Sequence, residues 1–154
     1  MAQLNIMKWT RGDYEISTDP ARLDLGFVHK ELLETYWSKN ISRAAVETAF
    51  ANSLVFGVYR AGGAQVGFAR LVTDHATFAY LCDVVITPGE RGRGLGGWLN
   101  ECIVSHPGLS GLRRWLLMTK DAHGLYAKHG WAPLKYPMAF MERASAPAPV
   151  GGAA

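Results

Sequence analysis

The sequence predicts an α/β fold of the mixed (α+β) kind, and three observations support this prediction. The stretch from Leu54 to Ile86 contains three β-prone runs separated by turn residues. A glycine-rich loop, Glu90–Gly97, follows the last run and leads into a segment of helical periodicity. An apolar run, Arg113–Thr119, then completes a β-α-β unit, whose two strands we expect to be parallel and joined by a right-handed crossover.

The N-terminal third is expected to contain one strand and two helices. Asp13–Thr18 is β-prone, and from Leu23 to Trp37 apolar side chains recur at spacings of three and four, which is typical of an amphipathic helix. Ser42 suits the N-cap of a second helix, because its hydroxyl can accept a hydrogen bond from an amide of the first turn. The apolar face of that helix would comprise Ala45, Val46, Ala49 and Phe50.

The middle of the chain predicts an antiparallel meander. Leu54–Arg60 and Gln65–Asp74 flank a Gly-Gly turn, which indicates a hairpin. After a second turn, Thr77–Ile86 is the most β-prone run of the sequence and supplies a third antiparallel strand. Beyond the glycine loop, Leu95–His106 has helical spacing and ends before Pro107.

The C-terminal part is expected to contain a short helix, a last strand and a tail. Asp121 is predicted to N-cap a helix that runs through His129. Tyr136–Glu142 alternates weakly and is predicted to close the fold as a strand. The stretch 144–154 is rich in Pro, Ala and Gly and is predicted to be a disordered tail, which leaves 1–143 as a single domain.

The composition excludes several classes of protein. Charged residues make up 19% and hydrophobic residues 49% of the chain, and no apolar run approaches the roughly 20 residues of a membrane span, so no membrane partner is expected. The net charge of +3 is dispersed, which argues against nucleic acid but is compatible with an anionic small ligand. Cys82 and Cys102 are too few for a disulfide framework or a four-ligand metal site, so we expect no metal and a reducing, cytoplasmic setting.

The glycine loop is the strongest functional signal in the sequence. A loop that enters a helix offers unpaired amides and the positive end of the helix dipole, and glycines let an anion approach the backbone closely. Arg91 and Arg93 add formal charge, so a pyrophosphate is the expected ligand.

A nicotinamide or flavin dinucleotide is the rival ligand, because the spacing of three loop glycines fits the G-x-G-x-x-G fingerprint and Asp121 could bind a ribose. Against it, five residues separate the preceding strand from the first glycine of the fingerprint, Gly92, and only 33 residues follow Asp121. That is too short for the second half of a dinucleotide fold, and no Gly-Lys-Ser/Thr follows to make a P-loop.

The stretch Val84–Leu99, with the sequence VVITPGERGRGLGGWL, resembles the acetyl-CoA-binding core of the GNAT superfamily of N-acetyltransferases. The family's pattern Arg/Gln-x-x-Gly-x-Gly/Ala is matched there, and LYAKHGWAP downstream resembles its Tyr-x-x-x-Gly-Phe segment. The similarity covers roughly residues 54–133. The matching residues are Arg91, Gly94, Gly96, Tyr126, Gly130 and Trp131.

The resemblance implies a mixed, mostly antiparallel central sheet, flanked by helices and splayed at the β-α-β unit, with acetyl-CoA in the splay. It implies an enzyme that moves an acetyl group from acetyl-CoA, its co-substrate, to a primary amine of a small molecule or peptide by direct transfer. Strand backbone would bind the pantetheine arm and loop amides the pyrophosphate, while Thr119 stands where relatives often carry Asn. The implied cofactor-binding residues are Val84, Val85, Ile86, Arg91, Gly92, Arg93, Gly94, Leu95, Gly96, Gly97 and Thr119.

The transfer also needs a proton donor for the leaving thiolate and a base for the amine. A tyrosine, with a pKa of about 10, suits the first role, and Tyr126 matches the family's tyrosine for it. Asp83 is a candidate base, because burying an ionised carboxylate in an apolar strand is costly unless the group is paired with a partner or has a chemical role. The alternative is that Asp83 makes a structural hydrogen bond to a loop or to an arginine. His75, Asp121 and His123 are further candidates, and the glutamate that many relatives use beside Asp83 is missing.

The sequence does not identify the amine acceptor. Its expected contacts lie in the two N-terminal helices and the strand turns, and they are Tyr36, Trp37, Asp74, His75 and Tyr80. A homodimer is compatible with this fold. The alternative function is a non-catalytic acyl-CoA sensor, which would be indifferent to Tyr126→Phe.

Overall fold

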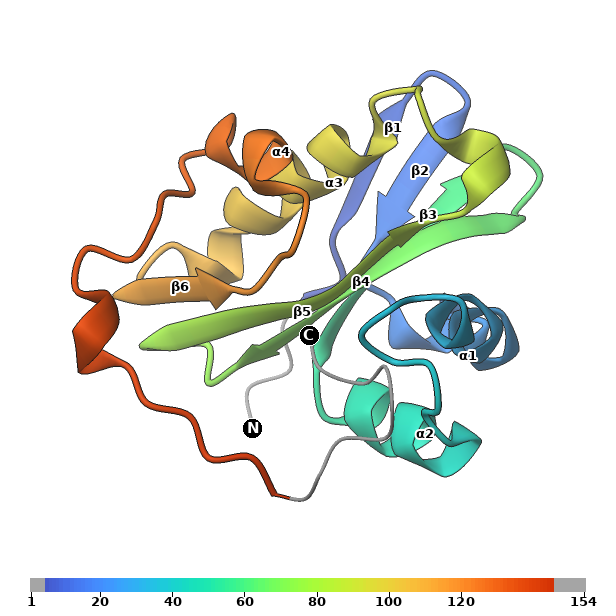
Figure 1. Cartoon of the computed structure of the whole chain (residues 1–154). Helices are drawn as coiled ribbons and strands as arrows, with labels where there is room; N and C mark the ends of the chain where they lie inside the picture. Colours follow the sequence, from blue (N-terminus) through green and yellow to red (C-terminus); the bar gives the residue numbers. More distant parts are fainter. Residues whose placement is uncertain (1–4, 146–154) are drawn as a thin grey trace.

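The computed structural model describes residues 5–145, which form one mixed six-stranded sheet in the order β1-β2-β3-β4-β5-β6 (Figure 1). The first five strands are antiparallel to their neighbours, and β6 joins β5 in parallel. The predicted meander, the β-α-β unit and the α/β fold class are therefore confirmed. The strands are β1 (Lys8–Arg11), β2 (Tyr14–Ser17), β3 (Leu54–Arg60), β4 (Gln65–Thr73), β5 (Phe78–Ile86) and β6 (Arg114–Leu117).

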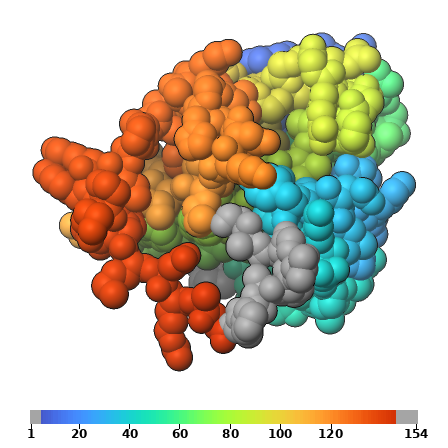
Figure 2. Space-filling view, viewed as in Figure 1, coloured from blue at the N-terminus to red at the C-terminus, as the bar shows by residue number. Residues whose placement is uncertain are grey.

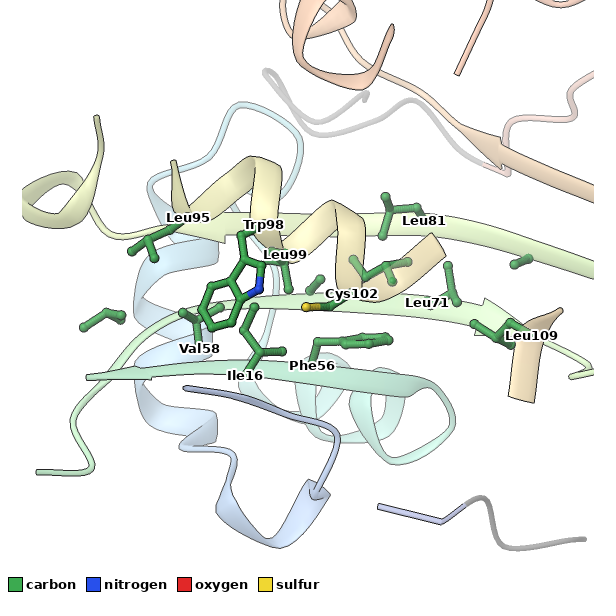
Figure 3. Close-up of a cluster of buried hydrophobic side chains, with 14 residues drawn as sticks. Ile16, Phe56, Val58, Leu71, Leu81, Leu95, Trp98, Leu99, Cys102 and Leu109 are labelled. Carbon is green, nitrogen blue, oxygen red and sulfur yellow. The ribbon is translucent and has the colours of Figure 1, made fainter. Parts of the chain in front are cut away.

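Helices cover both faces of the sheet (Figure 1). On one face, α1 (Leu25–Leu33) and α2 (Arg43–Ala51) enclose a core that includes Val28, Val46 and Phe68. On the other, α3 (Leu95–Val104) lies beside α4 (His123–Ala127). Figure 3 shows Leu95, Trp98, Leu99 and Cys102 of α3 among Ile16, Phe56, Val58 and Leu71 of the strands. Among the described residues, no helix is long and apolar enough to cross a membrane.

The ends of the two N-terminal helices follow from their capping side chains. Ser42 is the N-cap of α2, as predicted, and its hydroxyl accepts from the amide of Ala45 at 3.1 Å. The predicted helix from Leu23 to Trp37 is too long at both ends. Asp24 caps α1 by accepting from the amide of Phe27 at 3.0 Å, and the helix ends at Leu33, so the aromatic residues 36 and 37 lie in the loop between α1 and α2.

Strand β1 is absent from the sequence-based prediction, which had only the strand now seen as β2. The two strands form a hairpin, with Lys8 opposite Ser17 and Arg11 opposite Tyr14. Gly12 has a φ of +55° in the connecting turn, a conformation that favours glycine. The Gly12-Asp13 pair between two short β-prone runs is a hairpin signal that would have predicted this strand.

Two further predictions near the C-terminus are wrong. Asp121 does not cap α4: the N-cap position is Ala122, whose amide donates to Thr119 Oγ1 at 3.1 Å, and the helix ends at Ala127. Tyr136–Glu142 is not a strand. Its Pro137 has no amide to donate to a ladder, and it begins the 3₁₀ turn η4 (Pro137–Ala139) instead. Most of the predicted tail, 144–154, lies outside the described residues.

Candidate active site

The two parallel strands of the β-α-β unit separate halfway along β5. Their pairing ends at Leu81↔Leu117, so residues 82–86 of β5 have no strand partner on that side within the described part of the chain. Backbone groups that lack a ladder partner need another one, and a ligand can supply it. The carbonyl of Ile86 already accepts from Arg91 Nε at 2.9 Å.

A β-bulge marks the point of separation. Arg70 of β4 pairs with Asp83 and the next residue, Leu71, pairs with Leu81, so Cys82 is an extra residue in β5. A bulge bends its strand and increases the local twist. It also changes which side chains face which layer: Leu81 packs in the α3 core, whereas Asp83 faces the α1–α2 side. Val84 and Ile86 pack against the α3 core and Val85 against the other.

The glycine loop brings an open helix N-terminus to the end of this splay. Gly94 is the N-cap of α3 with a φ of +75°, and Gly92 has a φ of +79°. Neither conformation suits an L side chain, and a Cβ at either position would meet no protein atom within 4 Å, so space is left for a ligand. No side chain caps α3 and no acidic residue lies in its first turn. The helix amides and dipole are therefore available to an anion.

The two arginines of the loop are held differently. Arg91 bonds back onto the end of β5, whereas Arg93 Nε lies 3.4 Å from Glu90 Oε2 and its side chain is half exposed. Glu90 is buried at the base of the loop, where it also pairs with Arg60 and accepts from the Tyr14 hydroxyl. Glu90 has no signal of its own in the sequence beyond its place beside Arg91.

Tyr126 lies on α4 and packs against the core beneath α3. Its half-buried ring packs edge-on against Trp131 with centroids 6.1 Å apart. Burial, and next the phenol of Tyr36, raise the pKa of Tyr126 above its ordinary value, so the hydroxyl stays protonated at neutral pH. A largely apolar cavity of about 360 Å³ adjoins it, lined by Trp115, Leu116, Leu117, Met118, Thr119, His123, Tyr126, Ala127, Trp131, Ala132, Pro133 and Leu134.

The α1–α2 loop crosses from one splayed strand to the other. Trp37 Nε1 donates to Asp83 Oδ1 at 2.9 Å, on β5. The hydroxyl of Tyr36 accepts from the amide of Lys120 at 3.1 Å, just after β6. Figure 2 shows the result on the surface, where the blue loop segment meets the orange segment that contains Lys120. Four predicted site residues, Tyr36, Trp37, Asp83 and Tyr126, are thus brought to one place.

Asp83 is buried and paired. Its Oδ2 accepts from Arg70 Nε at 2.7 Å, so both carboxylate oxygens are engaged. This is the structural pairing that the sequence left open as the alternative to a base. Arg70 was missed, although a lone arginine between apolar residues of a predicted strand is a signal that a buried partner exists.

The remaining predicted residues are divided between this region and the far end of the sheet. Tyr80 lies on β5 near Arg70, and burial raises its pKa. Thr119 and His123 line the Tyr126 cavity. Asp74 and His75 instead form the β4–β5 turn, before the start of β5, where the Asp74 carboxylate accepts from the amides of residues 76–78. The structure does not bring these two residues to the others.

Comparison with known proteins gives one family. A model of the "Acetyltransferase (GNAT) domain" matches residues 51–133. A protein of Gibberella zeae, named as an acetyltransferase by inference, is 36% identical over 152 residues, which cover 82% of this chain and 84% of that protein.

Solved structures agree with this match. A GNAT-family protein of Xanthomonas campestris, also assigned as an acetyltransferase by inference, is 46% identical with a TM-score of 0.83 and covers 88% of this chain and 95% of its own. A GNAT acetyltransferase of Elizabethkingia anophelis, solved with acetyl-CoA bound, shares the fold with a TM-score of 0.59 at 12% identity, over 77% of this chain and 76% of its own.

Proposed function

The chain belongs to the GNAT family of acetyltransferases, and on that premise we propose that it moves an acetyl group from acetyl-CoA to a primary amine by direct transfer. The observation that supports this best is the uncapped N-terminus of α3, which follows the stretch of β5 that has no partner on the β6 side. An anion-binding helix end and free strand backbone are both needed to hold a long ligand that has a pyrophosphate at one end.

The proposed cofactor contacts follow from that geometry. The amides of Gly92–Gly97 and the guanidinium groups of Arg91 and Arg93 would bind the pyrophosphate. The backbone of Val84–Ile86 would pair with the pantetheine amides, and Thr119 would line the opposite wall. Acetyl-CoA supplies the thioester that reacts, and the chain supplies its orientation, which alone can account for much of a rate enhancement.

Tyr126 is the proposed general acid. The amine nitrogen attacks the thioester carbon, the carbon–sulfur bond breaks, and the Tyr126 hydroxyl gives its proton to the departing thiolate. His123, which lines the same cavity, is the proposed acceptor of the amine proton. Asp83 is less suited to act as the base, because its carboxylate is already held by Trp37 and by the counter-ion Arg70.

The proposed acceptor is a small molecule or peptide amine with an apolar body. Tyr36, Trp37 and Tyr80 are half-buried aromatic residues on the α1–α2 side of the splay, and they would contact it. The nearby charges of Arg70 and Asp83 compensate each other, so they offer little to a strongly charged acceptor. We place the reaction in the cytoplasm, since Cys82 and Cys102 are both free thiols.

We also propose a homodimer, because large apolar side chains in the segment that follows β6 are exposed. Met138 and Met141 are 94% and 98% exposed, and Tyr136 and Met118 are 65% and 54% exposed. Exposed patches of this kind mark association surfaces. The double variant Met138→Glu/Met141→Glu should be a monomer in light scattering, where the parent protein is a dimer. Ile6→Glu is the control, because Ile6 is 60% exposed but lies elsewhere, and it should leave the dimer intact. A monomeric parent protein would refute the proposal.

Calorimetric titration with acetyl-CoA, CoA and NADH tests the cofactor. We expect micromolar binding of acetyl-CoA and CoA that Gly94→Trp abolishes, and no binding of NADH. A panel of amines followed by CoA release then tests transfer. Binding without transfer to any amine, unchanged by Tyr126→Phe, would instead identify an acyl-CoA sensor, and NADH binding alone would refute the family's chemistry for this chain.

A further inference from the structure

We propose that Asp83 is a positioning residue, which fixes the α1–α2 loop across the splayed strands and takes no proton from the acceptor. The contacts that support this are independent of the reaction. Only the kinetic part of the test below rests on the proposed acetyl transfer.

The Asp83 carboxylate joins three separate segments of the chain. It lies on β5, accepts from Arg70 of the neighbouring strand β4 at 2.7 Å, and accepts from the indole of Trp37 in the α1–α2 loop at 2.9 Å. Arg70 is itself fixed by Ser53, whose hydroxyl accepts from Nη1 at 3.3 Å, and by the ring of Phe50 at 5.7 Å. A carboxylate held by two donors in this way is a rigid attachment point for the third segment.

Trp37 transmits this attachment to its neighbour Tyr36. The two rings pack edge-on with centroids 4.9 Å apart, so the position of one restricts the other. The Tyr36 hydroxyl accepts from the amide of Lys120 at 3.1 Å, and the Lys120 ammonium lies 5.6 Å from the centre of the Tyr36 ring. The link from Asp83 through Trp37 and Tyr36 therefore ends on the segment after β6, across the splay and next to the element that carries Tyr126.

The charges around Asp83 favour this role over proton transfer. The titratable groups that face it are Arg70 on β4 and Tyr80 and Cys82 on β5. Burial raises the pKa of both Tyr80 and Cys82, which keeps them neutral, so Arg70 is the charge that compensates the carboxylate. A proton on Asp83 would remove the counter-ion of half-buried Arg70 and weaken the hydrogen bonds from Arg70 and Trp37, which is a costly state.

The test is amide hydrogen exchange at Lys120, measured by NMR on the full chain without ligand. Tyr36→Phe removes the acceptor and sets the unprotected rate. We expect Trp37→Phe and Asp83→Asn each to raise the Lys120 exchange rate about tenfold, the size of one hydrogen bond to a charged group, and their combination to add little more. Trp9→Phe is the matched control: the same change on β1, where Trp9 packs on Phe56 and His106, should leave Lys120 protected.

Two outcomes of the exchange experiment would overturn the proposal. The first is a Lys120 rate that stays at the parent value in Trp37→Phe while Tyr36→Phe raises it. The second is a rate unchanged by Tyr36→Phe itself, since the bridge would then be absent. Trp37→Phe keeps the buried ion pair and an aromatic ring, so this arm is informative even if Asp83→Asn does not fold.

Kinetics separate positioning from proton transfer, using acetyl-CoA and the amine that releases CoA fastest. Positioning predicts that Trp37→Phe and Asp83→Asn both raise the KM for the amine several-fold. Both variants should keep the acid limb of the pH–rate profile, and the Kd for CoA should be unchanged. Loss of the acid limb in Asp83→Asn alone would show that Asp83 is a base. If the chain transfers no acetyl group, the exchange result still decides the role of the loop.

Discussion

The hydroxyl of Tyr14 donates a hydrogen bond of 2.5 Å to the buried carboxylate of Glu90. Tyr14 lies on β2, so this bond ties the base of the glycine loop to the antiparallel side of the sheet. Glu90 also pairs with Arg93 of the loop, and the loop geometry therefore depends on a residue more than seventy positions away in the sequence.

Tyr14→Phe should loosen the glycine loop and weaken CoA binding. Loss of a hydrogen bond to a buried carboxylate should lower the free energy of unfolding by about 1.5–3 kcal/mol, measured by urea denaturation. The Kd for CoA should rise several-fold by calorimetry, because the loop amides are less well ordered before binding. Acetyl-pantetheine, which has no pyrophosphate, is the control ligand; an equal loss of affinity for it would contradict a role confined to the loop.

Gly94→Ala should be more damaging than its small size suggests. The φ of +75° at this N-cap costs a residue with a Cβ about 1–2 kcal/mol, and relaxing the strain would move the amides that face the anion. We expect a lower midpoint of thermal unfolding together with at least tenfold weaker CoA binding. Gly89→Ala is the matched control, because Gly89 has no positive φ and a Cβ there would meet no atom within 4 Å. Similar behaviour of the two variants would refute the argument.

Tyr126→Phe should lower kcat by about 10²- to 10⁴-fold, the usual contribution of a general acid. The Kd for CoA should hardly change, since the ring and its packing on Trp131 are kept. In the parent enzyme, the raised pKa of Tyr126 should keep the acid protonated to beyond pH 10, so the alkaline limb of the kcat profile should lie above that pH. A wild-type kcat in the variant would remove Tyr126 from the mechanism.

The buried imidazole of His106 should make the protein less stable in acid. Burial, and next the neighbouring His75, lower the pKa of His106 below its ordinary value of 6.5. Above pH 6.5 the ring is neutral in both folded and unfolded chains. As the pH falls below 6.5 the unfolded chain binds the proton first, so the free energy of unfolding decreases until the lowered pKa is reached.

Urea denaturation at pH 7.5 and pH 5 measures this decrease. His106→Asn should reduce it, because asparagine does not titrate yet can still accept from the amide of Gly108, as His106 Nδ1 does at 3.0 Å. An unchanged pH dependence in that variant would assign the acid sensitivity to other groups.

Local signals in the sequence predicted most of the fold. The predicted bounds of β3, β4 and β5 agree with the structure to within one residue at each end, because β-prone runs are separated there by glycine and aspartate turns. The strand prediction at Tyr136–Glu142 is wrong because weak alternation alone does not make a strand, and Pro137 has no amide to donate to a neighbouring strand. The prediction that Asp121 starts α4 rests on the frequency of aspartate at N-caps. In the structure, the N-cap residue is Ala122, and its amide donates to the hydroxyl of Thr119, three residues before it.

The candidate site was predictable where it depends on local sequence. The glycine loop and Tyr126 belong to local sequence motifs, so they can be found without knowing which distant residues they contact. The partners of Asp83 were not predictable in the same way, because Trp37 and Arg70 meet it through the register of β4 with β5 and the path of the α1–α2 loop. Tyr36 was selected as an acceptor contact, and its bond to Lys120 is a tertiary contact between residues 84 positions apart.

The bulge in β5 depends on there being one extra residue at position 82 and not on the thiol of Cys82. Replacing the side chain with serine or valine leaves the count of residues in β5 unchanged, whereas deleting the residue would let β5 run in regular register with β4. Leu81 and Asp83 would keep their present faces, because they already pair with the consecutive residues Leu71 and Arg70, but the bend and extra twist where β5 leaves β6 would be lost. The chain thus tolerates variation in what stands at this position but not in its length, and a gap there in a homologous sequence would indicate a strand that lacks this bend.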